Sequence, residues 1–178
     1  INLNALACLD SLIWLQTGKE VAKRFSYNQS SVSRQQKHCC EIFETSLIKN
    51  NNEWGLNKPN DLIRMERLVH QLARFQGLRT LRMEATYWSA PLLCTPEPEG
   101  WILGLSNIVG IKRNHQLLRD GIIDAWLCSA PDLPDCDDPD LTSIQLCKMP
   151  VHLMVGKSHP LLRKGKNIQW DDLADFPS

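Results

Sequence analysis

Polar side chains able to hydrogen-bond to a nucleic acid are concentrated in the segment from Thr17 to His38. The segment has one acidic residue, Glu20, and a local excess of basic residues: Lys19, Lys23, Arg24, Arg34 and Lys37. Gln and Arg side chains can form bidentate hydrogen bonds to base edges, whereas Ser and Lys side chains bind phosphates. The segment is therefore a candidate polyanion surface, although a charge run of this kind is also typical of a solvated helix face.

Helices are needed to hold these side chains on one surface, and the sequence predicts a pair of helices that could do so. The first helix has an apolar stripe at three- and four-residue steps: Leu3, Leu6, Leu9 and Ile13. Thr17 can cap a second helix over residues 19–25, because its hydroxyl can accept from an early backbone N–H. The basic side chains of this second helix are expected to point outward: Lys19, Lys23 and Arg24.

A third helix is predicted from about Gln29 to Phe43, after a short turn. Its expected inner face is Val32, Gln36, Cys39 and Phe43. Its expected outer face is Gln29, Ser30, Ser33, Arg34 and Lys37. A short helix, a tight turn and a helix that opens with amide, hydroxyl and guanidinium groups form the layout of a helix-turn-helix.

The stretch from Thr17 to Arg34 resembles the DNA-binding motif of LysR-type transcriptional regulators. The characteristic positions of that motif are occupied by Ala22, Phe25, Gln29, Val32, Ser33 and Arg34. The resemblance implies a winged helix-turn-helix, a linker helix that dimerises, and an effector domain related to periplasmic binding proteins. It also implies which side chains face double-stranded DNA: Thr17, Gln29, Ser30, Ser33 and Arg34. Lys37, on the same face, is predicted to contact phosphates.

The chain departs from the family pattern within the third helix and at its end. Gln36 and Cys39 occupy positions where the family has large aliphatic residues. Cys40 replaces a Glu, and Glu44 replaces the Gly that ends the helix. An inward-facing Gln must find a hydrogen-bond partner or cost about 1–3 kcal/mol. We therefore expect a less stable winged domain than in a typical member.

The polar segment 50–55 is suited to the tip of a wing, and a linker helix is predicted to follow it. Asn57 is expected to cap this helix, and Pro59 to lie in its first turn. Apolar residues then recur at coiled-coil spacing: Leu62, Met65, Val69 and Leu72. The spacing alone is equally typical of an amphipathic helix packed on its own domain. The resemblance implies that these residues form a dimer seam.

Charge and proline content divide the chain near residue 84. Residues 1–84 contain 12 Lys and Arg against 8 Asp and Glu, and residues 85–178 contain 8 against 12. Of the 10 prolines, all except Pro59 lie in the second part. The sequence therefore predicts a basic helical unit followed by a more acidic, turn-rich unit.

Alternating strand and helix patterns predict an α/β fold for the second part. Strands are expected at 78–85, 101–105 and 122–127, separated by helices at 86–93 and 114–120. This order implies a parallel core with right-handed crossovers. A surface loop is predicted at 132–140, and two further strands at 141–146 and 151–155. Residues 118–124 resemble a family signature, Leu-x-x-Gly-x-Leu-Asp, and motifs at 151–155, 159–161 and 172–177 follow the family order.

The resemblance implies that a small-molecule effector binds between two halves of this domain. Thr86, Ser106 and Asn107 follow predicted strands, where hydroxyls and N–H groups meet the edge of such a cleft. Thr86 is equally consistent with an ordinary helix cap. The sequence ends at Ser178, soon after the second half begins, so we expect only one wall of the cleft and loose packing after Leu141.

The remaining reactive residue types do not form a recognisable catalytic or metal site. The seven cysteines include no C-x-x-C pair, and adjacent Cys39 and Cys40 point in different directions on a helix. His159 precedes a proline and is typical of a turn, while Asp124 is expected to be a structural hydrogen-bonding group. We predict no metal, no cofactor and no enzymatic activity.

These observations lead to one fold and one main function. The predicted fold is α/β overall, with an all-α winged helix-turn-helix (1–58), a linker and dimerisation helix (59–77) and a partial effector-binding domain (78–178). The expected function is a cytoplasmic, effector-controlled, DNA-binding transcriptional regulator that acts as a dimer or higher oligomer. No apolar run reaches the ~18 residues of a membrane span.

Two other classes of function stay open at this point. One is a small-molecule-binding module whose degenerate winged domain serves only in dimerisation. The other is an α/β enzyme, although the chain has no recognisable Gly-rich phosphate loop or catalytic constellation.

Overall fold

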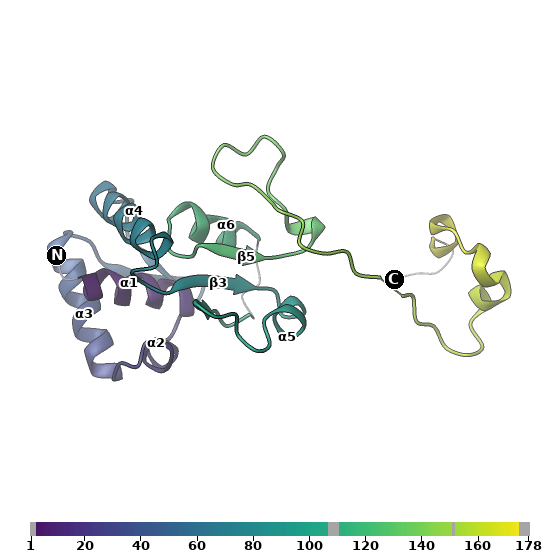
Figure 1. The fold of residues 1–178 in the computed structure, drawn as a ribbon, viewed down its shortest axis with the longest axis horizontal. Helices are drawn as coiled ribbons and strands as arrows, with labels where there is room; N and C mark the ends of the chain where they lie inside the picture. Colours follow the sequence, from purple (N-terminus) through teal and green to yellow (C-terminus); the bar gives the residue numbers. More distant parts are fainter. Residues whose placement is uncertain (1–2, 107–110, 151, 175–178) are drawn as a thin grey trace. The chain divides into compact units, whose positions relative to one another are not determined.

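The computed structural model describes residues 3–106, 111–150 and 152–174 (Figure 1). Helices account for 46% of it and strands for 12%, a mixed content that agrees with the predicted α/β class. The chain divides into two compact units, residues 1–143 and residues 144–178. Each unit is described by itself below.

The first three helices are α1 (Leu3–Leu15), α2 (Gly18–Arg24) and α3 (Gln29–Ile42). The predicted apolar stripe of α1 is too narrow, because Ala5, Cys8, Trp14 and Leu15 are also buried. Neighbouring elements cover α1 on several sides, so it is the central helix of the first unit.

Side-chain caps begin both α2 and α3. The Thr17 hydroxyl accepts from the backbone N–H of Glu20 at 3.2 Å, which confirms the predicted cap. Asn28 Oδ1 accepts from Ser31 N at 2.8 Å and begins α3. Arg24 is not outward-facing as expected. Its Nε and Nη2 atoms donate to the carbonyl oxygens of Leu103 (2.9 Å) and Gly104 (3.1 Å).

A two-stranded antiparallel hairpin follows α3 and consists of β1 (Leu47–Asn50) and β2 (Glu53–Leu56). Asn51 and Asn52 connect the strands with φ angles of 48° and 67°. Positive φ at both central residues characterises the type I′ turn, and Asn tolerates this conformation better than most residues. The polar segment predicted as a turn is therefore the tip of this hairpin.

Helix α4 (Asp61–Phe75) begins later than the sequence suggests. Asn60, not Asn57, caps it, accepting from Ile63 N at 3.0 Å. Asn57 Oδ1 instead accepts from Thr45 Oγ1 at 2.8 Å and Ser46 N at 3.1 Å, closing the base of the hairpin. Pro59 consequently lies before the cap rather than in the first turn.

A three-stranded parallel sheet forms the second half of this unit, in the order β4-β3-β5. Its strands are β3 (Leu81–Ala85), β4 (Trp101–Leu103) and β5 (Ala125–Leu127). Helices α5 (Ser89–Leu93) and α6 (Ile111–Arg119) lie in the two connections. The predicted strand-helix-strand-helix-strand order is confirmed, but the strand expected at 122–127 begins only at Ala125. Ile122 and Ile123 precede it as buried core residues.

Irregular structure dominates the rest of the described chain. The strands expected at 141–146 and 151–155 are wrong, because no strand occurs in the described residues of these ranges. Their side chains are mostly exposed, and no neighbouring strand pairs with them, so a ladder is not formed. Three short 3₁₀ helices lie outside these two ranges: η1 (Ala130–Asp132), η2 (Pro160–Asn167) and η3 (Trp170–Leu173).

Candidate nucleic-acid interface and effector site

The outer face of α3 carries a continuous set of exposed polar side chains. Residues at four-residue steps lie on one side of a helix, which places Gln29, Ser33 and Lys37 in a row. Ser30 and Arg34 form the adjacent row, and Arg34 Nη2 lies 3.4 Å from Ser31 Oγ. Thr17 is also exposed, so all six residues expected to contact DNA are available to a partner.

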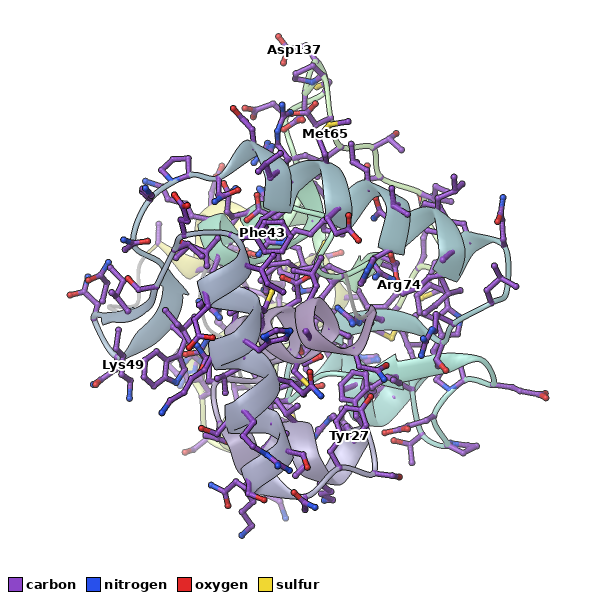
Figure 2. All side chains as sticks on the ribbon, turned by 90° about the vertical axis from the view of Figure 1, so that its left-hand side faces the viewer. Tyr27, Phe43, Lys49, Met65, Arg74 and Asp137 are labelled. Carbon is purple, nitrogen blue, oxygen red and sulfur yellow. The ribbon has the colours of Figure 1, made fainter. Side chains whose placement is uncertain are left out.

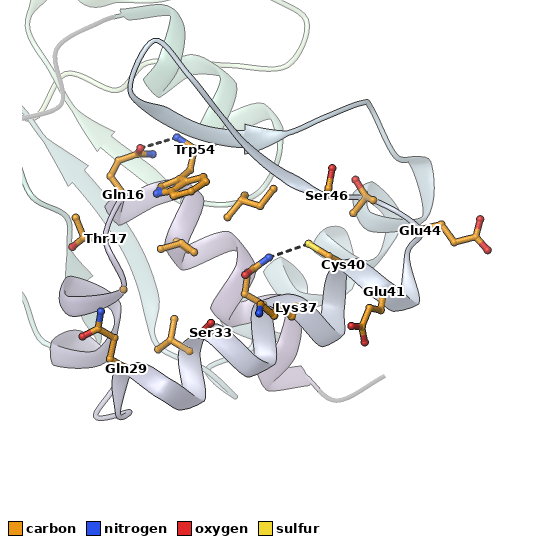
Figure 3. Close-up of a pocket in the computed structure, with 16 residues that line it drawn as sticks. Gln16, Thr17, Gln29, Ser33, Lys37, Cys40, Glu41, Glu44, Ser46 and Trp54 are labelled. Carbon is orange, nitrogen blue, oxygen red and sulfur yellow. Dashed lines mark hydrogen bonds between the residues drawn. The ribbon is translucent and has the colours of Figure 1, made fainter.

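An open cleft of about 820 Å³ lies between α3 and the hairpin (Figure 3). Gln29, Ser33 and Lys37 line it on the helix side, and Trp54 lines it on the hairpin side. Trp54 is fixed by a backbone hydrogen bond, in which its N–H donates to Gln16 Oε1 at 2.8 Å. The row of polar side chains on α3 is therefore one wall of a groove rather than part of a flat surface.

Gln36 and Cys39, which replace large aliphatic residues on α3, lie in different surroundings. Gln36 is half-buried and lines the cleft, where its Nε2 donates to Cys40 Sγ at 3.3 Å. Cys39 is fully buried, and burial raises its thiol pKa to about 12. Burial likewise raises the pKa of Cys8 to about 11. These two thiols stay protonated near neutral pH, which favours packing roles over redox chemistry.

The hairpin adds a cation that the sequence reasoning missed. Lys49 Nζ lies 5.7 Å from the centroid of the Trp54 ring, a cation–π contact across the two strands. Figure 2 shows Lys49 at the outer edge of the hairpin. A Lys and a Trp at facing positions of two short strands are the signal that could have identified this pair.

Helix α4 presents two chemically different faces. Its inner face buries Ile63 together with three basic side chains, Arg67, His70 and Arg74. Its outer face exposes six large apolar side chains: Leu62, Met65, Leu68, Val69, Leu72 and Phe75. Figure 2 shows Met65 pointing away from the body of this unit. The helix therefore packs on its own unit through one face and leaves the predicted seam residues uncovered on the other.

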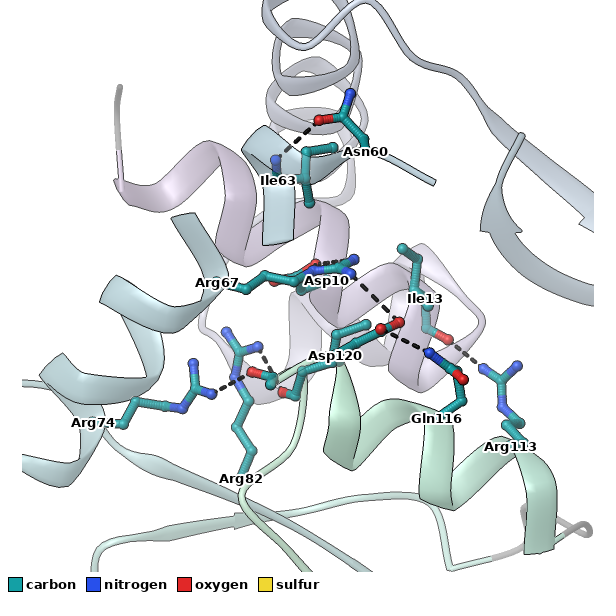
Figure 4. A network of polar contacts seen from close by, with 12 residues as sticks. Asp10, Ile13, Asn60, Ile63, Arg67, Arg74, Arg82, Arg113, Gln116 and Asp120 are labelled. Carbon is teal, nitrogen blue, oxygen red and sulfur yellow. Dashed lines mark hydrogen bonds and ion pairs between the residues drawn. The ribbon is translucent and has the colours of Figure 1, made fainter. Parts of the chain in front are cut away.

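Ion pairs attach α4 to the helix and sheet beneath it (Figure 4). Arg67 donates to Asp10 on α1 at 2.8 Å. Arg74 holds both carboxylate oxygens of Asp124, at 2.7 and 2.9 Å. Asp124 also accepts from the backbone N–H of Arg82 at 2.9 Å, which confirms its predicted structural role.

The carboxyl edge of the parallel sheet carries the residues expected to contact an effector. Thr86 follows β3, and its hydroxyl lies 2.7 Å from Ser89 Oγ while its N–H donates to the carbonyl oxygen of Leu127 at 3.1 Å. The hydroxyl contact lies within the turn that leads into α5, whose cap position is Trp88, and the N–H bond extends the pairing of β3 with β5. Ser106 follows the neighbouring strand β4 and has a φ of 57°. Asn107 lies outside the described residues.

Glu84 is a buried carboxyl group beneath this edge, and the sequence reasoning did not identify it. It accepts from Trp14 Nε1 at 2.8 Å, from Ser106 N at 2.8 Å and from Ala85 N at 3.2 Å. Burial raises its pKa, and these three donors act in the opposite direction. A Cβ on Gly104 would lie 2.0 Å from Glu84 Oε2, so a side chain there would displace the Glu84 carboxylate. An acidic residue inside a predicted buried strand is the signal that could have indicated this group.

Residues 3–106, 111–150 and 152–174 contain no candidate metal cluster and no candidate membrane span. No group of three or more His, Cys, Asp or Glu side chains there could hold a metal ion. No helix among the described residues is both long enough and apolar enough to cross a membrane.

Comparison with known proteins gives one match. Residues 111–178 match the family model described as the LysR substrate binding domain. Searches of curated proteins and of solved structures gave no match. The matched range begins at α6 and includes the 118–124 signature, whereas Thr86 and Ser106 precede it. Residues 111–178 are therefore similar to a LysR substrate binding domain, and this match supports a LysR-type regulator with an effector-binding domain.

Proposed function

We propose that this chain is a DNA-binding transcriptional regulator of the LysR type, acting in the cytoplasm as a dimer or higher oligomer under the control of a small-molecule effector. The proposed domains are a winged helix-turn-helix (1–58), a linker helix (59–77) and an effector-binding domain (78–178). The observation that carries the proposal is the exposed polar face of α3, which follows a capped turn and lies beside a hairpin. The matched family is regulatory, so no catalytic step is proposed.

The DNA contacts divide by chemistry. Gln29 and Arg34 carry amide and guanidinium groups that can bind a base edge through two hydrogen bonds. Thr17, Ser30, Ser33 and Lys37 are suited to phosphates, which orient the protein without reading sequence. The wing would contribute Lys49, which lies on the hairpin beside the groove. A helix in the major groove with a hairpin lysine beside it uses both kinds of contact.

The exposed apolar face of α4 supports oligomerisation through this helix. Isolated apolar residues are common on surfaces, but six large ones on one face of a single helix form a patch that favours a partner. Pairing two copies through Leu62, Met65, Val69 and Leu72 would give a dimer with two recognition helices. Dimers of helix-turn-helix proteins bind half-sites about one helical turn apart.

The proposed effector site is the carboxyl edge of the parallel sheet. Thr86 and Ser106 follow adjacent parallel strands, so both lie at the same edge. Asn107 is proposed as a third contact. Ligands of open α/β sheets bind outside the carboxyl ends of the strands, which supports this location.

The alternative is a small-molecule-binding module whose winged domain serves only in dimerisation. Gln36 and Cys39, which weaken the aliphatic core of α3, favour it. A salt-dependent DNA-binding measurement separates the two functions. The regulator should bind duplex DNA with an affinity that falls linearly on a log–log plot against salt. A dimer that shows no such binding at low salt supports the alternative.

A further inference from the structure

A second, smaller pocket lies at the opposite end of β3 from Thr86. Its volume is about 120 Å³. The polar side chains that line it include Tyr27, His70, Arg74, Arg79, Thr80 and Arg82. No carboxylate lines this pocket among the described residues. The lining is therefore basic, although the chain as a whole has a formal net charge of zero.

Arg82 is one of two buried arginines that line this pocket, and Arg74 is the other. The Arg82 side chain is 4% exposed, and its Nη1 donates to the carbonyl oxygen of Ile122 at 3.1 Å. The guanidinium carbon lies 5.6 Å from the centroid of the Phe25 ring. Burial, and then the nearby Arg74, lower its pKa to about 10.

The neighbouring arginines show what Arg82 lacks. Arg67 and Arg74 are buried to a similar degree, and each forms an ion pair with a carboxylate. Arg82 forms no ion pair with any carboxylate in the described part of the chain. Asp10 and Asp124 attract it, but these two groups already bind the other arginines. A buried cation without a directly bonded anion is strongly destabilising, so a counter-ion here would be favourable.

His70 provides a second, independent sign of a missing ligand. The residue is 8% exposed, and its Nε2 is buried without a hydrogen-bond partner among the residues described. The distance from His70 Nε2 to Glu66 Oε1 is 3.7 Å, which is too long for a hydrogen bond. Buried polar atoms are nearly always satisfied in folded proteins, by protein groups, water or ions. An acceptor in the pocket would satisfy this nitrogen when it carries a proton.

We propose that this pocket binds a small tetrahedral oxyanion, either free phosphate or the phosphate group of a small molecule. Arg82 and Arg74 would donate from the buried side, and Arg79, which is exposed, from the rim. His70 would donate through Nε2, and the hydroxyls of Thr80 and Tyr27 could complete the shell. Charge-assisted bonds of this kind are the strong ones, and guanidinium groups match the geometry of an oxyanion. A volume of about 120 Å³ admits one such anion.

Titration with inorganic phosphate tests the proposal, with the unfolding midpoint and calorimetric heat as readouts. Phosphate and sulfate, compared with chloride at equal ionic strength, should each raise the midpoint saturably and bind one ion per chain. A parallel titration with phosphoserine identifies the source, because a site for free ions only should exclude it. Equal midpoint shifts with phosphate, sulfate and chloride, or a shift with phosphate that does not saturate, would overturn the proposal.

Two variants and one control localise the effect. Arg79→Gln removes the exposed donor and should weaken phosphate binding roughly tenfold, the loss of one charge-assisted hydrogen bond. Arg64→Gln removes the same charge from an exposed position on α4 and should leave the phosphate affinity unchanged. Arg82→Met should abolish the phosphate response. Arg82→Met alters a buried site and could prevent folding. In that case the comparison between Arg79→Gln and Arg64→Gln tests the proposal. Equal affinities in those two variants would refute the site.

Discussion

Glu44 ends α3 in a backbone conformation that favours glycine. Its φ is 49°, and it occupies the position after the helix cap Phe43. Thr45 N donates to Cys40 O at 3.0 Å, and Glu44 N donates to Glu41 O at 3.3 Å. These two bonds define the Schellman motif, in which the left-handed residue is usually Gly. The helix end therefore has the normal hydrogen bonds of this motif, but Glu44 adopts a strained backbone conformation.

The substitution Glu44→Gly should consequently stabilise the protein. Relief of the left-handed conformation is worth about 1–2 kcal/mol, and the greater freedom of Gly in the unfolded chain reduces the gain to about 1 kcal/mol. Urea denaturation measures the change. Glu41→Gly, an exposed position inside the same helix, is the matched control and should cost about 1 kcal/mol. Destabilisation by both variants would contradict the strain argument.

Glu84 should make stability depend on pH in an unusual direction for a carboxyl group. Its pKa in the folded state is raised above the ordinary value of 4.5, mainly by burial. The folded state then binds the proton more tightly than the unfolded state, so the contribution of Glu84 is full below pH 4.5. This contribution is lost as the pH rises through the folded pKa.

The variant Glu84→Gln should lack this pH dependence. The free energy of unfolding of the wild type should fall relative to that of the variant as the pH rises above about 4.5. Urea unfolding at a series of pH values gives this difference directly. Asp61→Asn, at an exposed carboxylate, is the control and should show no comparable trend. A difference that grows in the opposite direction would mean that the three hydrogen bonds outweigh burial.

Arg34 and Lys37 should contribute to DNA binding in different ways. If Arg34 reads a base, Arg34→Ala should cost about 1–3 kcal/mol and relax specificity at one position. Lys37→Ala should weaken binding to all sequences similarly and reduce the salt slope by about one unit. Fluorescence anisotropy with a duplex selected from a random library, at two salt concentrations, separates these effects. Arg163→Ala, outside the proposed interface, is the control, and unchanged binding in both α3 variants would contradict the regulator function.

At the scale of elements, α4 is defined by its two faces. The coiled-coil spacing predicted one apolar face, and the resemblance to the family implied that this face forms a seam; in the structure its residues are exposed. The basic inner face was not predicted, because Arg67 and Arg74 are buried only through carboxylates far away in the chain. Because the cationic face of α4 packs inward, its apolar face points outward. This inversion makes the outer face the expected contact between copies.

Replacing Met65 and Val69 together by Glu should convert the protein to monomers. Two carboxylates in an apolar contact between copies would have to be buried without partners, which is strongly unfavourable. Sedimentation velocity over a range of concentrations measures the oligomeric state. Leu92→Glu with Leu93→Glu, at exposed apolar positions of α5, is the matched control and should leave the oligomer intact. Wild-type protein that is monomeric at high concentration would exclude the seam.

At the scale of the whole molecule, the two compact units differ in how much they bury. The first has a core that includes Trp14, Leu9 and Ile123, whereas Leu161 is the buried residue of the second within its described part. Met154 in the second unit is 90% exposed. With so little apolar surface removed from water, residues 144–178 have few contacts to oppose local unfolding.

Limited trypsin digestion should therefore cut the second unit first. Early cleavage is expected after Lys148, Lys157 and Arg163, all of which are exposed. Arg74 and Arg82 lie in the buried part of the first unit and should be protected. Mass spectrometry of the first fragments identifies the sites. Early cuts within β3 or α4, with 144–178 intact, would contradict the difference in stability between the units.

The sequence was most informative where structure depends on neighbouring residues. The Thr17 cap and the helix-sheet alternation are set by local patterns, and both were predicted. The Asn60 cap was missed because Thr45 and Ser46 bind Asn57, a contact between distant residues. The candidate DNA face was predictable from spacing on one helix. The bonds of Arg24 to Leu103 and of Glu84 to Trp14 were not predictable, since these partners lie 79 and 70 residues away.

The bond between Trp14 and Glu84 has a consequence for how the chain acquires its structure. It joins residues separated by 70 positions, and Arg24 reaches Leu103 across 79. Contacts of such separation form slowly, because the entropy of closing a long loop is lost before the contact contributes. Helices α1 and α2 can form early, but their buried polar groups find partners only after β3 and β4 have been made. We therefore expect the N-terminal helices to reach their final state in the same cooperative step as the sheet.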